Sequence, residues 1–597
     1  MNKIKNKKSL KEITVCDETV LTMNMTTSGI RFKQALIEAG IDNPSLIRKL
    51  IIIGKLTYID CWDISEIMGK TLLELDLERA SVENGVNCLA SGDKYFEQLT
   101  SFILPALFDE TIIYFESCPC LSSITIHPDN PLYAGEDGVL YNKDKTELVF
   151  FPLGKQGDYF VPASVKYLEK EFAFNCPDLS SFTVHSDNLD YSSEDGVLYN
   201  KDKTILILYP GKRQGNLFIP ASVTEIGSDA FHYSSELISI NVHPDNPNFS
   251  SENGVLFNKD KTKLLMYPRG RQGDYIIPDS VVDAGFKRCR GLTSIIITKT
   301  IVEIGNFAFI DDCPALTSIT VHPDNPNYSS IDGVLFNKDK TKLILCPEGK
   351  KGDYVIPDSV FEIGSCAFSN CDGLLSIIIS NSVSKIGGSA FSWCNGLTSI
   401  TIPKSVVEIE EDNNRITAFI DDCPTLTSIT VHPDNPNYSS IDGVLFNKGK
   451  TELLFYPKGR KGDYIIPDSV VEIRKGAFNY CDLTSITIPD SVVKIGSFAF
   501  SDNKNLTSFV FSKSIRQISM FAFWGCINLA SVSIPDSVRE IESYAFSECY
   551  NLKVVTISKS VVYIAEDAFE RCPAVFMVHP ENPVYKSENG KLTKKVN

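Results

Sequence analysis

The chain has 597 residues, which is too long for one ordinary globular core, so several domains or one elongated repeat array are expected. Its 43% hydrophobic and 22% charged residues are typical of a folded protein. The formal net charge of −17 argues against a nucleic-acid partner and against electrostatic binding to a membrane surface, because both depend on Lys and Arg.

Residues 1–45 are predicted to form an N-terminal segment with one short amphipathic helix, Ile30 to Gly40, that caps the open end of the array behind it. The basic start MNKIKNKKSLKEITVCDETV is not followed by the apolar run of a secretory signal, and no stretch has the length of a membrane span. If the start is native, a cytoplasmic location is expected.

A repeat of 23 residues dominates the rest of the chain. Leu483, Leu506, Leu529 and Leu552 are each 23 residues apart, and each opens a segment such as LTSITIPDSVVKIGSFAFSDNKN. The L-x-x-I-x-I spacing predicts a short strand, Pro-Asp-Ser a turn, and V-x-x-I and Ala-Phe further core residues. No single repeat can bury its own apolar side chains, so a stacked solenoid is predicted.

The strand signal recurs about 21 times along the chain. The last apolar residues of the predicted strands are Ile52, Leu77, Leu104, Ile126, Val161, Val184, Ile219, Val242, Ile277, Ile297, Val321, Ile356, Ile379, Ile402, Val431, Ile466, Ile488, Phe511, Ile534, Ile557 and Val578. The commonest step is 23 residues, and the insertion EEDNNRI (Glu410 to Ile416) explains a step of 29. The prediction is a β-rich α/β horseshoe or curved rod.

Five steps are 35 residues long, and each contains a copy of HPDNPNYSSIDGVLFNKDKTKL or a close variant. We interpret each as a 23-residue repeat expanded by a β-hairpin. In the fourth copy, the first strand of the hairpin is Gly333 to Phe336, the turn is Asn337 to Thr341, and the second strand is Lys342 to Leu345. A truncated copy begins at His579, in a C-terminal tail of residues 579–597.

The segments LTSITIPDSVVKIGSFAF and NPNYSSIDGVLFNKDKTKL resemble the BspA-like leucine-rich repeat family of bacterial surface proteins. The resemblance covers about Leu46 to Val578, and Gly54 to Ala80 is similar to the irregular first repeats of the family. It implies a leucine-rich repeat domain over residues 46–578 and a binding role. Better-known members are cell-surface adhesins that recognise host matrix or plasma proteins and other bacteria, so a surface location is implied.

Six of the seven histidines begin copies of the expanded motif, which raises the question of a metal site. Successive copies are separated by at least one repeat, so their imidazoles are expected too far apart for a tetrahedral zinc site. Asp324, Asn325, Asn327 and Asp332 offer oxygens, but the D-x-D-x-D-G calcium loop is absent. We interpret H-P-D-N-P as a structural turn, with no metal and no cofactor.

Eleven of the seventeen cysteines occupy one repeat position just before a strand, where buried free thiols are expected rather than disulfides or metal ligands. They are Cys118, Cys176, Cys289, Cys313, Cys371, Cys394, Cys423, Cys481, Cys526, Cys549 and Cys572. Glycine loops such as Gly349 to Asp353 join strand to strand, whereas phosphate loops lead into a helix. No catalytic triad is recognisable, so an enzyme is not predicted.

Two surfaces are candidates for partner binding. The first is the predicted concave face, with the hydroxyl residues Thr317, Ser318, Thr320, Thr398, Ser399, Thr401, Thr427, Ser428, Thr430, Thr484, Ser485 and Thr487, although Thr is also common on solvated strands. The second is the hairpin edge, with Tyr133, Tyr191, Phe249, Tyr328, Tyr438, Lys338 and Lys340. Both suit a protein or glycoprotein partner of a monomer.

Two functions remain open. The resemblance and the extended repeat surface favour an adhesin-like, non-catalytic binding protein. The missing export signal and the many free thiols favour an intracellular scaffold for protein interactions. An enzyme acting on glycans and an ice-binding surface are weaker alternatives.

Overall fold

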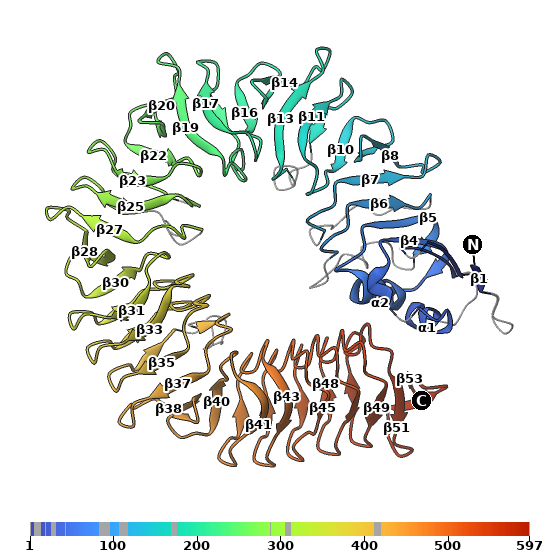
Figure 1. The fold of residues 1–597 in the computed structure, drawn as a ribbon. Coiled ribbons are helices and arrows are strands. Elements are labelled where there is room, and N and C mark those ends of the chain that lie inside the picture. The colour runs from blue at the N-terminus through green and yellow to red at the C-terminus, as the bar shows by residue number, and fades with distance from the viewer. Residues whose placement is uncertain are drawn as a thin grey trace. The chain divides into compact units, whose positions relative to one another are not determined.

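The computed structural model describes residues 2–4, 13–17, 19–25, 31–41, 43–82, 96–106, 118–168, 176–286, 288–304, 312–410 and 420–595 (Figure 1). The chain divides into two compact units, Met1–Arg271 (unit 1) and Gln272–Asn597 (unit 2). The predicted insertion at Glu410 to Ile416 lies, except for Glu410, outside the described residues.

Both units are built from stacked solenoid turns, about 21 in all, which confirms the predicted repeat architecture. Each turn contributes one strand to a parallel sheet. In unit 1 these strands are β4 (Lys49–Leu56), β5 (Glu74–Val82), β6 (Ser101–Leu104), β7 (Ser123–Ile126), β11 (Gly157–Val161), β13 (Leu179–Val184), β17 (Gly215–Ile219) and β19 (Leu237–Val242).

In unit 2 they are β23 (Gly273–Ile276), β25 (Leu292–Ile297), β27 (Ser318–Val321), β31 (Gly352–Val355), β33 (Leu374–Ile378), β35 (Ser399–Ile402), β37 (Ser428–Val431), β41 (Lys461–Ile465), β43 (Asp482–Thr487), β45 (Ser508–Phe509), β47 (Ser531–Ser533), β49 (Val554–Ile557) and β51 (Val575–Val578). The predicted last apolar residues lie within two positions of these strand ends, except in β4 and β5, which run further.

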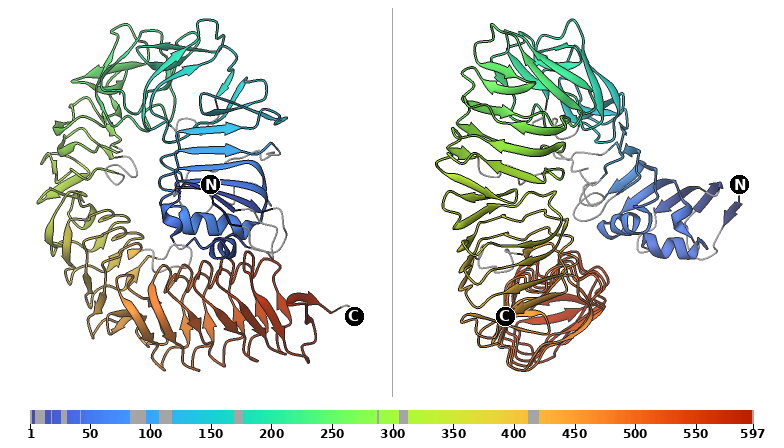
Figure 2. Two further views of the ribbon diagram at one scale, coloured as in Figure 1. Left: turned by 45° about the vertical axis from the view of Figure 1, so that its right-hand side comes forward. Right: turned by 60° about the vertical axis from the view of Figure 1, so that its left-hand side comes forward.

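Among the described residues, the α-helices lie at the N-terminal end of unit 1 (Figure 2). The strands β1 (Asn2–Ile4), β2 (Ile13–Asp17) and β3 (Val20–Met25) extend the β4 to β7 sheet, and β3 pairs with the edge of β4. The helices α1 (Phe32–Glu38) and α2 (Tyr58–Met68) and the 3-10 turn η1 (Pro44–Leu46) complete it. The helix predicted at Ile30 to Gly40 corresponds to α1, and the capping role of residues 1–45 stays a prediction.

Side chains of α2 hold α1 in place. Asp60 forms a capping box with Thr57, and its Oδ1 accepts a 2.6 Å hydrogen bond from the backbone N–H of Phe32 at the start of α1. The Asp63 carboxylate accepts another from the N–H of Lys33 at 3.2 Å. Two of the orphan N–H groups at the start of α1 are thus satisfied by carboxylates of its neighbour.

Outside this end, the described repeats use turns and two-residue strands where an α/β horseshoe would place helices. The short strands are β12 (Tyr167–Leu168), β18 (Glu225–Ile226), β24 (Asp283–Ala284), β26 (Glu303–Ile304), β32 (Glu362–Ile363), β34 (Lys385–Ile386), β36 (Glu408–Ile409), β42 (Glu472–Ile473), β44 (Lys494–Ile495), β46 (Gln517–Ile518), β48 (Glu540–Ile541) and β50 (Tyr563–Ile564). The predicted α/β character is thus restricted to the N-terminal turns.

The Ala-Phe doublets explain why helices are excluded from the later turns. The residue before Ala adopts a positive φ, for example 58° at Phe498 and 57° at Phe521, which a right-handed helix cannot include. The Phe of each doublet then stacks on that of the next repeat. Ring centroids lie 5.0 to 5.3 Å apart in the series Phe478, Phe500, Phe523, Phe546 and Phe569.

Each expanded repeat contains a three-stranded antiparallel meander, not only the predicted hairpin. The meanders are β8 (Tyr133–Glu136), β9 (Val139–Asn142) and β10 (Glu147–Phe150); β14 (Tyr191–Glu194), β15 (Val197–Asn200) and β16 (Ile205–Leu208); β20 (Phe249–Glu252), β21 (Val255–Asn258) and β22 (Lys263–Met266); β28 (Tyr328–Ile331), β29 (Val334–Asn337) and β30 (Lys342–Leu345); β38 (Tyr438–Ile441), β39 (Val444–Asn447) and β40 (Glu452–Phe455). The third strand replaces the two-residue strand of a regular repeat, and β30 pairs with β32.

The first connection of each meander is a two-residue turn that the sequence analysis missed. Asp332 and Gly333 have φ values of 50° and 78°, as a type I′ hairpin turn requires. The Gly333 carbonyl accepts a 2.8 Å hydrogen bond from Ile319 N–H of β27, and a Cβ at Gly333 would lie 2.8 Å from Ser318 Oγ. The turn therefore lies directly against β27, where only glycine fits.

This contact interrupts the parallel sheet. In unit 1 the described strands group as β1 to β7, β11 with β13, and β17 with β19; in unit 2 as β23 to β27, β31 to β37, β41 with β43, and β45 to β51. The breaks after β7, β13, β27 and β37 each coincide with a meander, whereas the break between β43 and β45 does not. The meander turn occupies the outer edge of the strand before it, so the next strand cannot pair there.

The predicted C-terminal tail contains a sixth copy of this arrangement. The strands β52 (Tyr585–Glu588) and β53 (Lys591–Lys594) form a hairpin, and Gly590 accepts a 2.8 Å hydrogen bond from Phe576 N–H of the last parallel strand. Lys591 and Thr593 of β53 are at the positions equivalent to Val334 and Phe336 of β29, which are buried. The hairpin thus covers the terminal turn of unit 2 and presents a polar outer side, as a capping repeat does.

Candidate binding surface

The outward positions of the parallel strands form a surface that we call the strand face; it corresponds to the concave face of the sequence analysis. In a regular strand such as β35, Ile400 and Ile402 are buried while Ser399 and Thr401 are exposed on the other side. The register carries these positions from strand to strand, with Ser376, Ser399 and Ser428 in one row. Ile378, Thr401 and Thr430 form the row beside it.

The structure places the predicted hydroxyl residues in two different environments. Ser318, Thr320, Ser399, Thr401, Ser428, Thr430, Ser485 and Thr487 lie on the strand face, exposed or half-buried. Thr317, Thr398 and Thr427 come just before their strands, and the hydroxyls of Thr317 and Thr427 bond to the carbonyls of Thr293 and Thr398 at 3.1 and 3.2 Å. Thr484 donates to Asp463 at 2.7 Å. These four threonines are exposed as well, so the extent of the predicted surface stays a prediction.

The predicted aromatic contacts of the hairpin edge are largely part of the fold. Tyr133 is buried, and Phe249 packs against the core. The hydroxyls of Tyr328 and Tyr438 accept hydrogen bonds from the N–H groups of Ile304 and Ile409, at 3.3 and 3.2 Å, and Tyr191 donates to the carbonyl of Lys166 at 3.1 Å. These half-buried side chains connect each meander to the repeat before it and offer little surface to a partner.

The two predicted lysines of the hairpin edge also differ. The Lys338 ammonium donates to the carbonyls of Pro323 and Asn325, at 2.8 and 2.5 Å, and so holds the H-P-D-N-P turn closed. Lys340 is exposed at the second turn, with a φ of 60°. Of the predicted hairpin contacts, Lys340 is thus the side chain that the structure leaves most accessible.

The asparagine of H-P-D-N-P is the residue on which the motif depends. Asn325 is fully buried; its Nδ2 donates to the carbonyls of Thr298 and Ile301 at 2.8 and 2.9 Å, and its Oδ1 accepts from the N–H groups of Asn327 and Tyr328 at 2.9 and 2.8 Å. Asn188, Asn246, Asn435 and Asn582 repeat this pattern. The amide therefore joins each motif to the preceding repeat.

The histidines have a smaller structural role. His322 Nδ1 accepts a 3.2 Å hydrogen bond from the N–H of Asp324 two residues later, and the other five copies form the same bond. Among the described residues, no three His, Cys, Asp or Glu side chains gather closely enough to hold a metal ion. The imidazoles close the turn in which they stand.

Ten of the eleven cysteines in the column are buried and Cys572 is half-buried, and several of them also form hydrogen bonds between repeats. The thiols of Cys394, Cys526 and Cys549 donate to the carbonyl of the stacked Phe in the preceding repeat, at 3.0, 3.1 and 3.2 Å. Asn503 replaces the thiol with a 2.7 Å bond to Phe478 O. Burial raises the pKa of Cys481 to about 12, so this thiol stays protonated as a donor at neutral pH.

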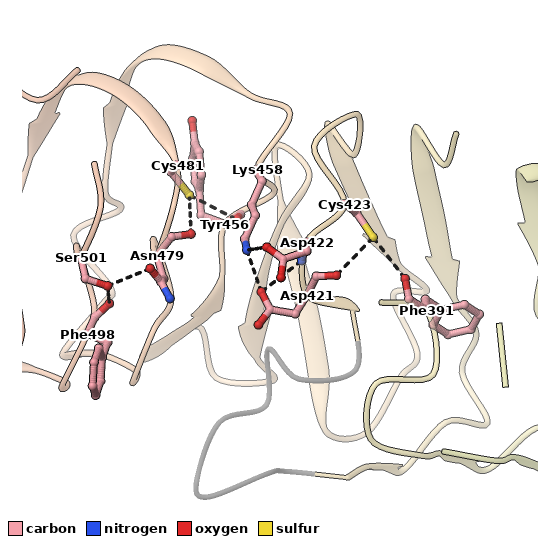
Figure 3. Close-up of polar contacts among 10 residues, drawn as sticks. All are labelled: Phe391, Asp421, Asp422, Cys423, Tyr456, Lys458, Asn479, Cys481, Phe498 and Ser501. Carbon is pink, nitrogen blue, oxygen red and sulfur yellow. Dashed lines mark hydrogen bonds and ion pairs between the residues drawn. The ribbon is translucent and has the colours of Figure 1, made fainter. Parts of the chain in front are cut away.

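The most enclosed ionic group in Figure 3 is Lys458, whose side chain is 7% exposed. Its ammonium pairs with Asp421 Oδ1 and Asp422 Oδ1, at 2.7 and 2.8 Å. It also lies 5.2 Å from the centroid of the Tyr480 ring. Burial lowers the pKa of Lys458, but the two carboxylates outweigh burial and raise it above its ordinary value. The cluster connects turns of adjacent repeats.

Replacing Lys458 by Met is expected to lower the free energy of unfolding by about 1 to 2 kcal/mol at pH 7, because two partly buried carboxylates lose their cation. The raised pKa means that this stabilisation is complete below the unfolded-state value of about 10.4 and is lost as pH rises through the folded-state value. Urea unfolding between pH 7 and pH 11 measures both effects.

The matched control is Lys461→Met, because Lys461 is 80% exposed and lies 3.5 Å from Asp482. It is expected to change stability by no more than a few tenths of a kcal/mol. Equal stability of Lys458→Met and the unmodified chain at pH 7 would contradict the assigned role.

One feature of the strand face has no counterpart in the sequence predictions. The strand after each meander carries an exposed apolar side chain, namely Phe160, Phe218, Ile276, Val355 or Ile465. Other strands hold either Thr at this position, as β35 does, or an exposed apolar residue such as Ile378 or Val510. The sequence D-Y-I-I-P predicts this exposure, because side chains alternate along a strand. A buried Tyr275 therefore places Asp274 and Ile276 on the exposed face.

No helix of the described residues has the length and apolar character needed to cross a bilayer. No curated protein matches the chain. Among solved structures, a leucine-rich cell surface protein from Faecalibacterium prausnitzii is 24% identical, with 66% of this chain and 96% of that chain covered and a TM-score of 0.39. The pneumococcal vaccine antigen PcpA is 21% identical, with 56% and 91% covered and a TM-score of 0.40.

A leucine-rich repeat protein from Eubacterium ventriosum is 20% identical, with 55% of this chain and 93% of that chain covered and a TM-score of 0.31. The model of the BspA type leucine rich repeat region, present in six copies, matches residues 211–261, 276–351, 350–462 and 451–576. These segments cover more than half of the sequence and contain the strands, turns and Ala-Phe doublets described above. The chain therefore belongs to the BspA type leucine-rich repeat family.

Proposed function

We propose that the chain is a non-catalytic scaffold that recognises a protein or glycoprotein surface through its strand face, in the manner of an adhesin. The observation that carries the proposal is the continuous row of exposed side chains on β31 to β37, held in one register by the parallel ladder. These positions have no packing role, whereas most predicted contacts at the hairpin edge are engaged within the fold. Membership of a family with known adhesins supports the same role.

The experiment compares the two surfaces on the full chain. Thr401→Arg with Thr430→Arg places two long cations on the strand face, and Lys340→Ala with Lys450→Ala removes two exposed cations from the second meander turns. Binding to immobilised host matrix proteins, plasma proteins and intact bacteria is measured by biolayer interferometry. The first pair is expected to weaken binding by about tenfold or more, because the substitutions obstruct contact.

The lysine pair is expected to leave binding within about twofold, because rim charges contribute little to affinity. If binding is lost only in the variant with Lys340→Ala and Lys450→Ala, the partner is recognised by the hairpin edge and not by the strand face. Failure of the unmodified chain to bind any immobilised protein or cell would count against the adhesin role.

A second candidate is an intracellular scaffold, and the cysteine column favours it. The bonds from Cys394, Cys526 and Cys549 to backbone carbonyls need reduced sulfur, which a reducing compartment maintains. Protease treatment of intact cells of the source organism separates the two candidates. Digestion of the full-length chain would exclude the intracellular scaffold, and complete protection would exclude a surface adhesin.

A further inference from the structure

The strands that follow the meanders, which we call post-hairpin strands, share a pair of outward residues. β11, β17, β23, β31 and β41 each carry an Asp or Asn and, two positions later on the same face, an exposed apolar side chain. The pairs are Asp158 with Phe160, Asn216 with Phe218, Asp274 with Ile276, Asp353 with Val355, and Asp463 with Ile465. The apolar members are 50, 54, 62, 59 and 72% exposed, respectively.

The fold does not require these apolar residues. Regular strands of the same sheets carry Thr320, Thr401, Thr430 and Thr487 at the equivalent position without loss of register. The identity changes among Phe, Ile and Val across the five copies, yet the apolar character is kept in each. Two of these side chains extend the patch by cross-strand pairs, Ile276 with Ile296 and Val355 with Ile378.

The carboxylates beside them are oriented by hydroxyl groups of the next strand. Asp274 Oδ1 accepts from Ser294 and Thr293 at 2.7 and 2.8 Å, and these bonds lower its pKa below the ordinary value. Asp463 Oδ1 is held in the same way by Thr484 and Ser485, and Asp353 Oδ1 accepts from Ser376 at 2.6 Å. All these bonds go to one carboxylate oxygen, Oδ1, so the hydroxyl groups fix the orientation of each exposed carboxylate.

Some of the basic residues at these sites are already engaged. Lys350 donates to the carbonyl of Asp332 at 2.6 Å, and Arg460 donates to the carbonyl of Asp442. Asp332 and Asp442 are themselves exposed. Lys351 and Lys461 are exposed at the start of β31 and β41, and Lys461 lies 3.5 Å from Asp482. A carboxylate next to an exposed apolar side chain is complementary to a partner segment with Lys or Arg next to an apolar side chain.

We infer that the post-hairpin strands are repeated contact points for a cationic segment of a protein partner, with Lys or Arg on the Asp carboxylate and an apolar side chain on the neighbouring exposed residue. This inference rests on the proposed function and names its partner class. The three sites of unit 2 lie on β23, β31 and β41, so a partner with several such pairs gains affinity by simultaneous contact.

The test selects binders to the full chain from a displayed library of random 12-residue peptides. Selected peptides are expected to be enriched in Lys or Arg next to aliphatic or aromatic residues. They are then measured against two triple variants, Ile276→Thr/Val355→Thr/Ile465→Thr and Asp274→Asn/Asp353→Asn/Asp463→Asn. Threonine is the residue of the regular strands, so the first variant should fold normally, as circular dichroism can verify.

Each triple variant is expected to weaken binding by about tenfold or more. The control Asp324→Asn/Asp339→Asn/Asp434→Asn removes three exposed carboxylates away from the post-hairpin strands and is expected to stay within about twofold of the unmodified chain. A selection without specific peptides, peptides without basic residues, or equal binding to all three variants would overturn the inference. A partner that loses binding through Thr401→Arg and Thr430→Arg but tolerates both triple variants would overturn it while leaving the proposed function intact.

Discussion

A chain that ends after Val578 is expected to aggregate and to lose its last solenoid turns. In the full chain, the β52–β53 hairpin makes two contacts with the preceding turns. The Gly590 carbonyl accepts a hydrogen bond from Phe576 N–H of β51, and the hydroxyl of the buried Tyr585 accepts one from Ile564 N–H at 2.8 Å. Without this hairpin, the edge of β51 and the core residues below it face water. An unpaired strand edge above an apolar core is a template for association.

Size-exclusion chromatography and hydrogen exchange of the truncated and full chains measure this result. The control is Asn582→Ala, which keeps the hairpin but removes its amide bonds to Ser558 and Val561. It is expected to loosen residues 554–595 with less association than the truncation causes. A monomeric truncated protein with unchanged exchange in residues 531–578 would contradict the capping role.

Replacing Asn435 by Ala is expected to lower the free energy of unfolding of its repeats by about 3 to 5 kcal/mol. The substitution leaves the carbonyls of Pro403 and Val406 and the N–H groups of Asn437 and Tyr438 without their bonds, which measure 2.8 to 2.9 Å. Each buried group left unsatisfied costs about 1 to 3 kcal/mol. The change is measured by urea unfolding and by hydrogen exchange over residues 399–447.

The histidine of the same copy is the matched control. His432 Nδ1 accepts one 3.1 Å bond from Asp434 N–H at an exposed turn. His432→Ala is therefore expected to cost no more than about 1 kcal/mol. If the two substitutions destabilise the chain equally, the asparagine is not the central residue of the motif.

The stacking of the repeats could be predicted because it depends on spacing. Apolar residues at intervals of two within a strand and 23 between strands locate the end of β33 near Ile379 and the end of β35 at Ile402 without knowledge of any contact. The meander was only partly predicted. Tyr328 to Ile331 is too polar to signal a strand by hydrophobicity, and the sequence analysis places Gly333 in the following strand rather than in a type I′ turn with Asp332.

Other features depend on residues of the neighbouring repeat. The side-chain amide of Asn325 donates to the carbonyls of Thr298 and Ile301, 27 and 24 residues earlier. The local sequence pattern around His322 therefore does not reveal the role of Asn325. Phe498 and Phe521 adopt a positive φ that their residue type disfavours, and their rings stack 4.6 Å apart across repeats. The exposed Ile276 was overlooked because core and surface residues are both apolar in D-Y-I-I-P.

The breaks in the parallel sheet at the meanders affect how local unfolding propagates from one solenoid turn to the next. In an uninterrupted ladder, fraying that begins at one strand weakens the next, because each strand depends on its neighbour. At Gly333 and Gly443 the strand edge is bonded to its own meander, so β27 and β37 keep their outer partner even when the following strands open. Each meander is therefore expected to act as a stop for partial unfolding, and a proteolytic nick in one segment should leave the adjacent segment folded.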